Sequence, residues 1–203
     1  MKNIKNIIFD LGGIFLNIDF KKTELAFAAL GINGFQSMFS QHHADNLFQL
    51  LETGKISPEE FHHSFVQKTG MNLSYSEVEK AWNALLLDFP VERLHWLKSV
   101  SKRYNTFLFS NTNRIHYDAF SQTFHNMMNE DFNSYFIKAY YSHEMGLRKP
   151  DPESFQYILN EQKLSPSETL FIDDTLKNVE AAAKLGIQTI HLVPPKTVLD
   201  LNL

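Results

Sequence analysis

The residues of this chain that could do chemistry stand at the ends of short apolar runs. Asp10 closes the run NIIFD, Ser110 and Asn111 follow NTFLF, and Asp173 and Asp174 close TLFIDD. A carboxylate can act as a nucleophile or bind a hard metal ion, and hydroxyl and amide groups can hold an anion. If the apolar runs are neighbouring parallel strands, these side chains meet at one edge of a sheet.

A cation completes this set of residues. Lys149 lies in GLRKPDP, where Pro150 biases it toward an extended backbone and Pro152 is placed to begin the next helix. Taken alone, an aspartate before Gly-Gly is typical of a turn, and Asp-Asp before a helix is typical of a cap. Their fixed order at the ends of successive predicted strands favours a common site.

The elements that must position these residues alternate between strand and helix. Residues 6–10, 105–110, 136–142, 169–174 and 188–193 are rich in β-branched and aromatic residues and are predicted as strands. Helical periodicity predicts helices at 91–104, 151–162 and 175–186. The alternation predicts an α/β fold, a Rossmann-like doubly wound parallel sheet.

The interval between the first two strands is too long for a simple crossover. Residues 20–89 contain no convincing strand but four helical patterns, at 20–30, 43–54, 57–70 and 74–87, and Ser57 with Glu60 matches a capping box. We therefore expect an α/β core of residues 1–19 and 90–203 with an inserted α-helical cap at 20–89. A cap that leaves the sheet after the first strand could close over a bound substrate.

Composition excludes several classes of function. The apolar share is 43%, the charged share 21% and the net charge −4, so the chain is globular with no basic field for nucleic acid. The absence of cysteine excludes thiolate catalysis, disulfides and cysteine-bound zinc. No apolar run is long enough for a membrane span, which predicts a cytoplasmic protein with no membrane partner, either a monomer or a weak dimer.

Four motifs resemble those of the haloacid dehalogenase superfamily, in the same order along nearly the whole chain. They are FDLGGI at 9–14, LFSNTN at 108–113, RKPDP at 148–152 and FIDDTLKNVEAA at 171–182. The longer strings SNTNRIH, EMGLRKPDP and ETGKISPEEF look most like the capped subgroup that contains the α-D-glucose-1-phosphate phosphatases. The resemblance implies a phosphatase that acts on a small phosphomonoester.

The resemblance also implies roles for residues at the matching positions. Asp10 would be the nucleophile that forms an aspartyl-phosphate, with Ser110 and Lys149 binding the phosphoryl group. Backbone N–H groups near Gly12, Gly13 and Asn111 would add donors. Mg²⁺ would be the cofactor, because a carboxylate and a phosphate dianion repel each other without a cation between them. Its ligands would be Asp10, the Gly12 carbonyl, Asp174 and, through a water, Asp173.

Gly12 departs from the pattern of the superfamily, whose phosphatases mostly carry a second aspartate there as general acid and base. One replacement is a proton supplied by the cap, from Glu52 or a neighbouring histidine. The other is a substrate with a good leaving group, such as a sugar 1-phosphate, whose ring oxygen stabilises the departing oxyanion. Lys55 and Gln49 are further candidates for substrate contact from the cap.

Two other functions stay open on the sequence. Without an acid at position 12 the protein could bind a phosphate ligand without turning it over. A metal-independent haloacid dehalogenase is less favoured, because those enzymes lack the Asp173 and Asp174 pair. The histidine pairs, His42 with His43 and His62 with His63, are expected on the surface or packed in the cap, since adjacent helical residues point in different directions.

Overall fold

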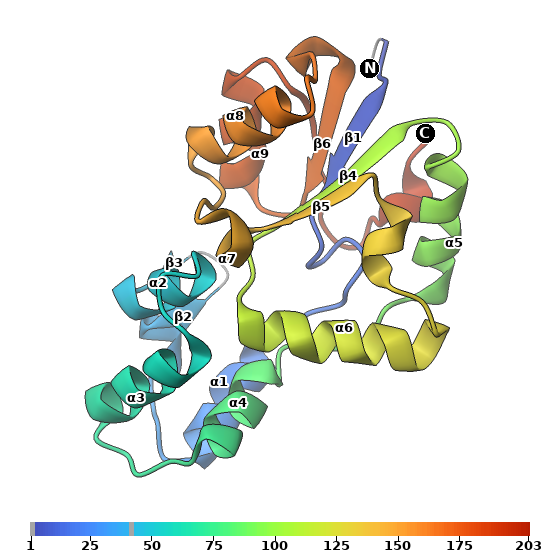
Figure 1. The fold of residues 1–203 in the computed structure, drawn as a ribbon. Helices are drawn as coiled ribbons and strands as arrows, with labels where there is room; N and C mark the ends of the chain where they lie inside the picture. The colour runs from blue at the N-terminus through green and yellow to red at the C-terminus, as the bar shows by residue number, and fades with distance from the viewer. Residues whose placement is uncertain (1–2, 41–42) are drawn as a thin grey trace.

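The fold is organised around one parallel sheet. A computed structural model describes residues 3–40 and 43–203. Five strands lie in the order β5-β4-β1-β6-β7, all parallel, with β1 in the centre (Figure 1). Their bounds are β1 Asn6–Phe9, β4 Asn105–Ser110, β5 Lys138–Tyr141, β6 Thr169–Asp173 and β7 Gln188–His191. The predicted doubly wound α/β fold is confirmed, with some strands shorter than their apolar runs.

Successive residues of the central strands face opposite sides of the sheet, and both sides are buried. In β1, Ile7 and Phe9 join one apolar cluster while Ile8 joins another. In β6, Ile172 and Phe171 divide in the same way. A sheet that is buried on both faces needs continuous apolar strands, which explains why these runs do not alternate with polar residues.

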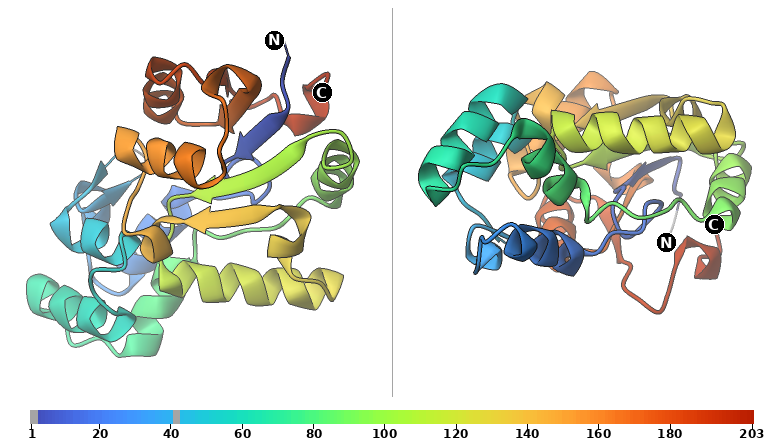
Figure 2. Two further views of the ribbon diagram at one scale, coloured as in Figure 1. Left: turned by 45° about the horizontal axis from the view of Figure 1, so that its top comes forward. Right: turned by 90° about the horizontal axis from the view of Figure 1, so that it is seen from below.

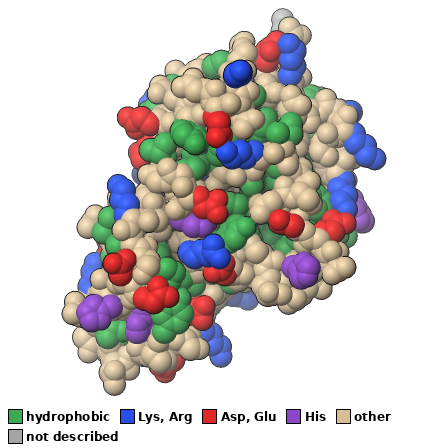
Figure 3. Space-filling model, viewed as in Figure 1, with side chains coloured by type: hydrophobic (Ala, Val, Ile, Leu, Met, Phe, Trp, Pro, Cys, Tyr) green, Lys and Arg blue, Asp and Glu red, His purple; other side chains and the backbone are tan. Residues whose placement is uncertain are grey.

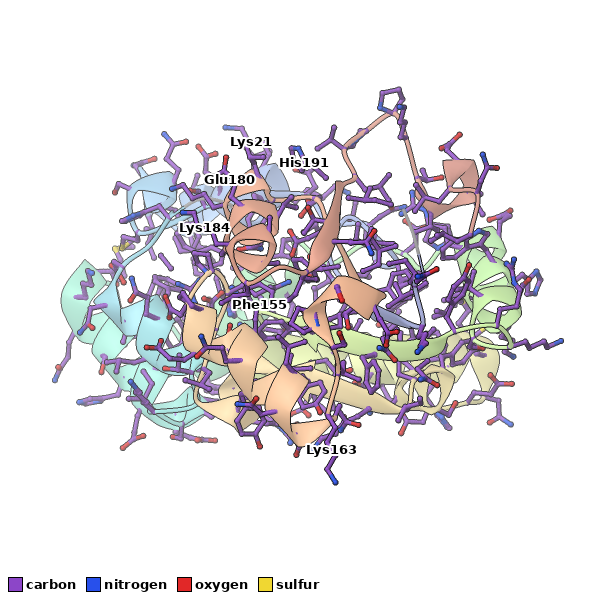
Figure 4. All side chains as sticks on the ribbon, turned by 90° about the horizontal axis from the view of Figure 1, so that it is seen from above. Lys21, Phe155, Lys163, Glu180, Lys184 and His191 are labelled. Carbon is purple, nitrogen blue, oxygen red and sulfur yellow. The ribbon has the colours of Figure 1, made fainter. Side chains whose placement is uncertain are left out.

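Helices cover the two faces. Figure 1 shows α5 (Val91–Val100) and α6 (Arg114–Met128) on one side of the sheet and α8 (Pro152–Glu161) and α9 (Leu176–Lys184) on the other. Phe155 points from α8 toward the strands, whereas Lys163 points away from them (Figure 4). Short elements complete this part of the chain: α7 (Ser142–Met145), η2 (Phe132–Tyr135), η3 (Pro166–Glu168) and η4 (Val198–Asp200).

Residues 20–89 form a separate group of helices beyond the carboxyl ends of the strands, and the views of Figure 2 agree on this arrangement. We call these residues the helical segment. It contains α1 (Phe20–Ala29), η1 (Phe35–Ser37), α2 (Asn46–Glu52), α3 (Pro58–Thr69) and α4 (Tyr75–Asn83). The predicted capping box is confirmed, because the Ser57 hydroxyl accepts from Glu60 N and Glu60 accepts from Ser57 N.

Two expectations for the helical segment were wrong in detail. It contains a short antiparallel pair of strands, β2 (Phe39–Ser40) and β3 (His43–Ala44), where the sequence predicted no strand. The helix expected from residue 43 begins only at Asn46. The reason is Asp45, whose carboxylate accepts from Leu47 N at 3.0 Å and caps the helix there.

The helical segment has its own aromatic core. Phe27, Phe48, Phe61 and Trp82 are fully buried and pack in one cluster, which also contains Ile115 of α6. The two chain ends of the segment pair with each other: Asp19 N donates to Leu85 O, and Asn17 and Leu87 are likewise bonded through their backbones. The chain therefore enters and leaves the helical segment through two adjacent strands of backbone that are hydrogen-bonded to each other.

Charged side chains of both signs are mixed on one face of the molecule. Figure 3 shows acidic and basic side chains interspersed over the face that it presents. The mixture is in keeping with the small net charge of −4. Among the helices of residues 3–40 and 43–203, none is long and apolar enough to cross a bilayer.

Gly54 lies where the helical segment meets the α/β layers, against the backbone of His143. Its φ is +62°, and a Cβ atom there would lie 2.0 Å from the backbone oxygen of His143. Gly70 has nearly the same conformation, with φ +67°, but open space around it. Comparing alanine substitutions at Gly54 and Gly70 therefore separates the destabilisation caused by the backbone conformation from that caused by the contact with His143.

We expect Gly70→Ala to lower the free energy of unfolding by about 1 to 2 kcal/mol, the strain of a left-handed alanine. Gly54→Ala should cost about 1 to 3 kcal/mol more, because a backbone carbonyl must move. Denaturant unfolding of both variants measures the difference. Equal losses in the free energy of unfolding would show that the backbone at His143 can move without destabilising the protein.

Candidate active site

Lys149 is held between two carboxylates at the centre of the sheet edge. Its Nζ donates to Asp10 Oδ1 at 2.7 Å and to Asp173 Oδ2 at 2.8 Å. Lys149 is 1% exposed and Asp173 is fully buried. Asp10 follows β1 and Asp173 ends β6, so the parallel pairing of these strands places the two carboxylates side by side.

Aromatic rings and a side-chain amide fix the position of Lys149. Its Nζ lies 5.2 Å from the ring centroid of Phe109 and 5.5 Å from that of Phe171, within range of a cation–π interaction. Phe155 packs edge-on against both rings. Asn111 donates to Lys149 O and accepts from Lys149 N, so both backbone groups of the lysine are bonded to one amide.

Asp173 is committed to hydrogen bonds within the protein. Besides Lys149, it accepts from Thr175 N at 2.7 Å and from the amide of Asn178 through both carboxylate oxygens. The predicted role of Asp173 toward a metal thus competes with four hydrogen bonds. Its observed contacts position Lys149 and the start of α9.

A cluster of three carboxylates fits a divalent cation. Ligand oxygens of Asp10, Asp173 and Asp174 lie within 4.8 Å of one another, the only such grouping found in the described part of the chain. Three carboxylates and the Lys149 ammonium sum to a charge of −2, and oxygen ligands suit a hard ion such as Mg²⁺. Gly12 lines the same cavity, and a Cβ at Gly13, where φ is +73°, would lie 2.7 Å from Asp174 Oδ2.

Burial and the negative charge of the cluster both affect the pKa of Asp10. Burial raises the pKa of Asp10 to about 7; Lys149 lowers it, while Asp173 and Asp174 raise it further. Burial also lowers the pKa of Lys149, but Asp10 and Asp173 outweigh that effect and the pKa is raised overall. The lysine stays charged, and a second cation would favour the ionised form of Asp10.

A cavity of about 270 Å³ opens above these residues, between the strand ends and the helical segment. The predicted residues that line it are Asp10, Gly12, Glu52, Ser110, Asn111, Lys149 and Asp174. Gln49 and Lys55 do not line it. Both are exposed, and the Gln49 amide donates to Ala44 O at 2.7 Å within the helical segment.

Glu52 enters the cavity as half of an ion pair that the sequence did not predict. Glu52 Oε2 lies 2.7 Å from an Nη atom of Arg148, and the side chains are 8% and 24% exposed. Burial raises the pKa of Glu52, while Arg148 and, less strongly, Lys149 lower it. Arg148 immediately precedes Lys149 in the RKPDP motif, and Asn178 lies in TLKN; nothing in either motif alone showed these contacts.

The position of the absent acid is filled by an apolar side chain. A Cβ atom at Gly12 would lie 2.8 Å from Ile18 Cδ1. The φ of Gly12 is not in the positive region that favours glycine, so the backbone accepts other residues there. The tip of a flexible isoleucine therefore is the main obstacle to a carboxylate at this position.

Of the histidines near the site and in the helical segment, His116 is buried, whereas His43 and His63 are exposed. His116 is 6% exposed and stacks on the Trp82 ring. Its Nδ1 is hydrogen-bonded to the Asn113 amide, and its Nε2 is hydrogen-bonded to Trp82 O. His62 contacts Leu73 O and His63 contacts Gln67. His43 lies in β3, not in a helix, and lines the cavity, whereas His42 lies outside the described residues.

The fold and the site together define a class of hydrolase. A model of haloacid dehalogenase-like hydrolases matches residues 4–186. The chain therefore belongs to that family, and the prediction of an enzyme of this superfamily is confirmed.

Its relatives include a protein named D-ribitol-5-phosphate phosphatase from Bacteroides thetaiotaomicron, 33% identical over 93% of this chain and 91% of the relative. An aspartate-to-alanine variant of a haloacid dehalogenase family enzyme from the same organism, solved with magnesium and inorganic phosphate, superimposes with a TM-score of 0.90 at 33% identity, covering 95% of this chain and 96% of that one. The structure of a predicted hydrolase of the family from Porphyromonas gingivalis superimposes with a TM-score of 0.85 at 32% identity. The match covers 93% of this chain and 90% of that one.

His116 generates a prediction about stability and pH. Burial lowers its pKa from 6.5 to about 4, so between these values the unfolded chain binds a proton that the folded chain excludes. The free energy of unfolding should fall as pH drops through this window, by about 3 kcal/mol from this group.

His116→Gln should flatten that part of the stability profile, as measured by denaturant unfolding from pH 7 to pH 4. His125→Gln, on an exposed position of the same helix, is the matched control and should leave the slope unchanged. An unaltered slope in the His116 variant would contradict the assignment.

Proposed function

We propose that this protein is a magnesium-dependent phosphatase that hydrolyses a sugar or sugar-alcohol phosphate through an aspartyl-phosphate intermediate. The observation that carries the proposal is the Lys149 ammonium bonded to Asp10 at 2.7 Å, with carboxylate oxygens of Asp10 and Asp174 within 4.8 Å of each other, close enough to share one cation. An ionised, cation-supported carboxylate at the floor of a cavity is the group that nucleophilic phosphoryl transfer requires. The related Bacteroides enzyme, solved with magnesium and inorganic phosphate, supports the proposal.

The reaction divides into two displacements at phosphorus. An Asp10 oxygen forms a bond to phosphorus as the bond to the substrate's alcohol oxygen breaks, and the departing oxyanion takes a proton from an acid in the cavity or from water. The oxygen of a water molecule then bonds to phosphorus as the bond between Asp10 and phosphorus breaks; the water gives up a proton to solvent, and inorganic phosphate and the carboxylate are released. Lys149 holds Asp10 in place, and Ser110 lies on the cavity wall as a donor to the phosphoryl oxygens.

Magnesium would be held by Asp10, Asp174 and the Gly12 carbonyl, where it would offset the repulsion between the carboxylate and the phosphate dianion. Asp173 would act indirectly, because Lys149, Thr175 and Asn178 already occupy its oxygens. The division of labour is that the lysine orients the nucleophile and the metal supplies the remaining positive charge.

Two leaving groups fit the proposal, and Gly12 bears on the choice. A sugar 1-phosphate needs little help from an acid, which suits the absent carboxylate and the resemblance to glucose-1-phosphate phosphatases. A terminal sugar-alcohol phosphate, as in the name of the Bacteroides relative, is a poorer leaving group and would need a proton from elsewhere in the cavity. Glu52 is a carboxylate of the cavity wall that could supply it.

The first test is phosphate release from p-nitrophenyl phosphate, glucose 1-phosphate, glucose 6-phosphate and D-ribitol 5-phosphate, with Mg²⁺ and with EDTA. We expect turnover that EDTA abolishes and that Asp10→Asn reduces by about 10³-fold or more while sparing the fold. Asp118→Asn, at an exposed position, is the control. Activity that survives both EDTA and the Asp10 variant would contradict the proposal.

The second test restores the acid. Gly12→Asp combined with Ile18→Val gives the new carboxylate room, and turnover of D-ribitol 5-phosphate should rise by about 10-fold or more, within the range of general acid catalysis. Glucose 1-phosphate should gain less, because its leaving group needs less protonation. The Ile18→Val single variant is the control, and equal gains on both substrates would contradict the leaving-group explanation.

A further inference from the structure

The wall of the cavity combines apolar and polar side chains. Ile18, Phe39 and Leu86 are among its apolar residues. Glu52, from the end of α2, and Arg148, from the loop before Lys149, add a paired carboxylate and guanidinium. Polar groups placed on a cavity wall fix how a ligand is oriented.

The pair has hydrogen-bonding capacity that the protein leaves unused. Glu52 Oε2 is paired with the guanidinium at 2.7 Å, but Arg148 Nε makes no hydrogen bond within the described residues. A buried donor without a partner is costly. Both side chains line the cavity and are 8% and 24% exposed, so a ligand in the cavity can meet their accessible atoms.

The chemistry of the ligand follows from having an acceptor and a donor side by side. A hydroxyl group can donate to the Glu52 carboxylate and accept from the Arg148 guanidinium at once, and neighbouring hydroxyls of a polyol can divide the two roles. A second phosphate or a carboxylate on the substrate can only accept, and Glu52 repels it. Because Glu52 neutralises Arg148, the pair offers no net charge to an anion.

Other cations of the cavity do not change this balance. Lys149 is bonded to Asp10 and Asp173. Lys177 also lines the cavity but is exposed, so solvent and salt screen its charge. Within the described part of the chain, the buried region of the cavity therefore has no cation in surplus for a second anionic group.

We propose that Glu52 and Arg148 form a hydroxyl-binding subsite that selects phosphate esters of uncharged polyols and rejects those with a second anionic group. The inference rests on the proposed phosphatase function, which it makes more specific. Glu52 supplies both the acceptor and the negative charge that excludes anions. Arg148 supplies the donor.

A matched pair of substrates tests the subsite. Glucitol 6-phosphate and 6-phosphogluconate share a six-carbon hydroxylated chain and differ at the far end, where one has a hydroxyl and the other a carboxylate. The wild type should favour glucitol 6-phosphate in kcat/KM by about 10-fold or more, the scale of one hydrogen bond to a charged group. An equal or better rate on 6-phosphogluconate would overturn the proposal.

Glu52→Gln keeps the size of the side chain and releases the charge of Arg148. We expect kcat/KM to fall about 10-fold for glucitol 6-phosphate and to rise for 6-phosphogluconate, with a smaller loss for p-nitrophenyl phosphate, which has no hydroxylated chain and a leaving group that needs no proton. Glu59→Gln, on an exposed position of the helical segment, is the control. An equal loss on all three substrates would overturn the subsite, since it would indicate a structural or proton-transfer role.

Arg148→Gln provides the opposite change and guards against a misfolded Glu52 variant. Arg148→Gln should lower kcat/KM for glucitol 6-phosphate and should not raise kcat/KM for 6-phosphogluconate. A rise for 6-phosphogluconate would contradict the proposal. Calorimetric titration of the magnesium-loaded wild type with each ligand and with inorganic phosphate tests the subsite separately from the phosphatase activity. Binding that prefers glucitol 6-phosphate, without turnover of any ester, would reject the phosphatase and retain the subsite.

Discussion

The shared Lys149 ammonium is the constraint on which the rest of the site depends. One buried cation bonds two carboxylates from adjacent strands, Asp10 and Asp173. Burying an unpaired charge is expensive, so each member of the group requires the others. The sheet order follows the same requirement, because β1 and β6 must be neighbours for their terminal aspartates to share the lysine.

The residues around the lysine divide the two carboxylates between different environments. Asp173 accepts hydrogen bonds from Lys149, Thr175 and Asn178 and holds the cation, whereas Asp10 lines the cavity. Phe109 and Phe171 lie within cation–π distance of the ammonium, and Phe155 packs against both rings. The core of the fold thus extends directly beneath the site, and packing there bears on its geometry.

The helical segment adds a different kind of control. Its contact with the α/β layers includes Gly54 against His143 and Glu52 against Arg148, so the chain that carries a specificity element is also pressed against the site. The stacked pair of Trp82 and His116 joins the segment to the start of α6. Any movement of the segment would have to break or repack these contacts, so the shape of the cavity depends on where the segment lies.

Much of this protein could be predicted from its amino-acid order, because the evidence was local. Apolar runs ending in Asp10, Ser110 and Asp173, with helical periodicity between them, predict the parallel sheet and the edge where these residues meet. The capping box at Ser57 is likewise a three-residue pattern. Only the tertiary structure decided that Asp173 binds the lysine, that Ile18 fills the space beside Gly12, and that Glu52 meets Arg148. Those contacts join residues far apart along the chain, and no local periodicity encodes which distant side chain a carboxylate will face.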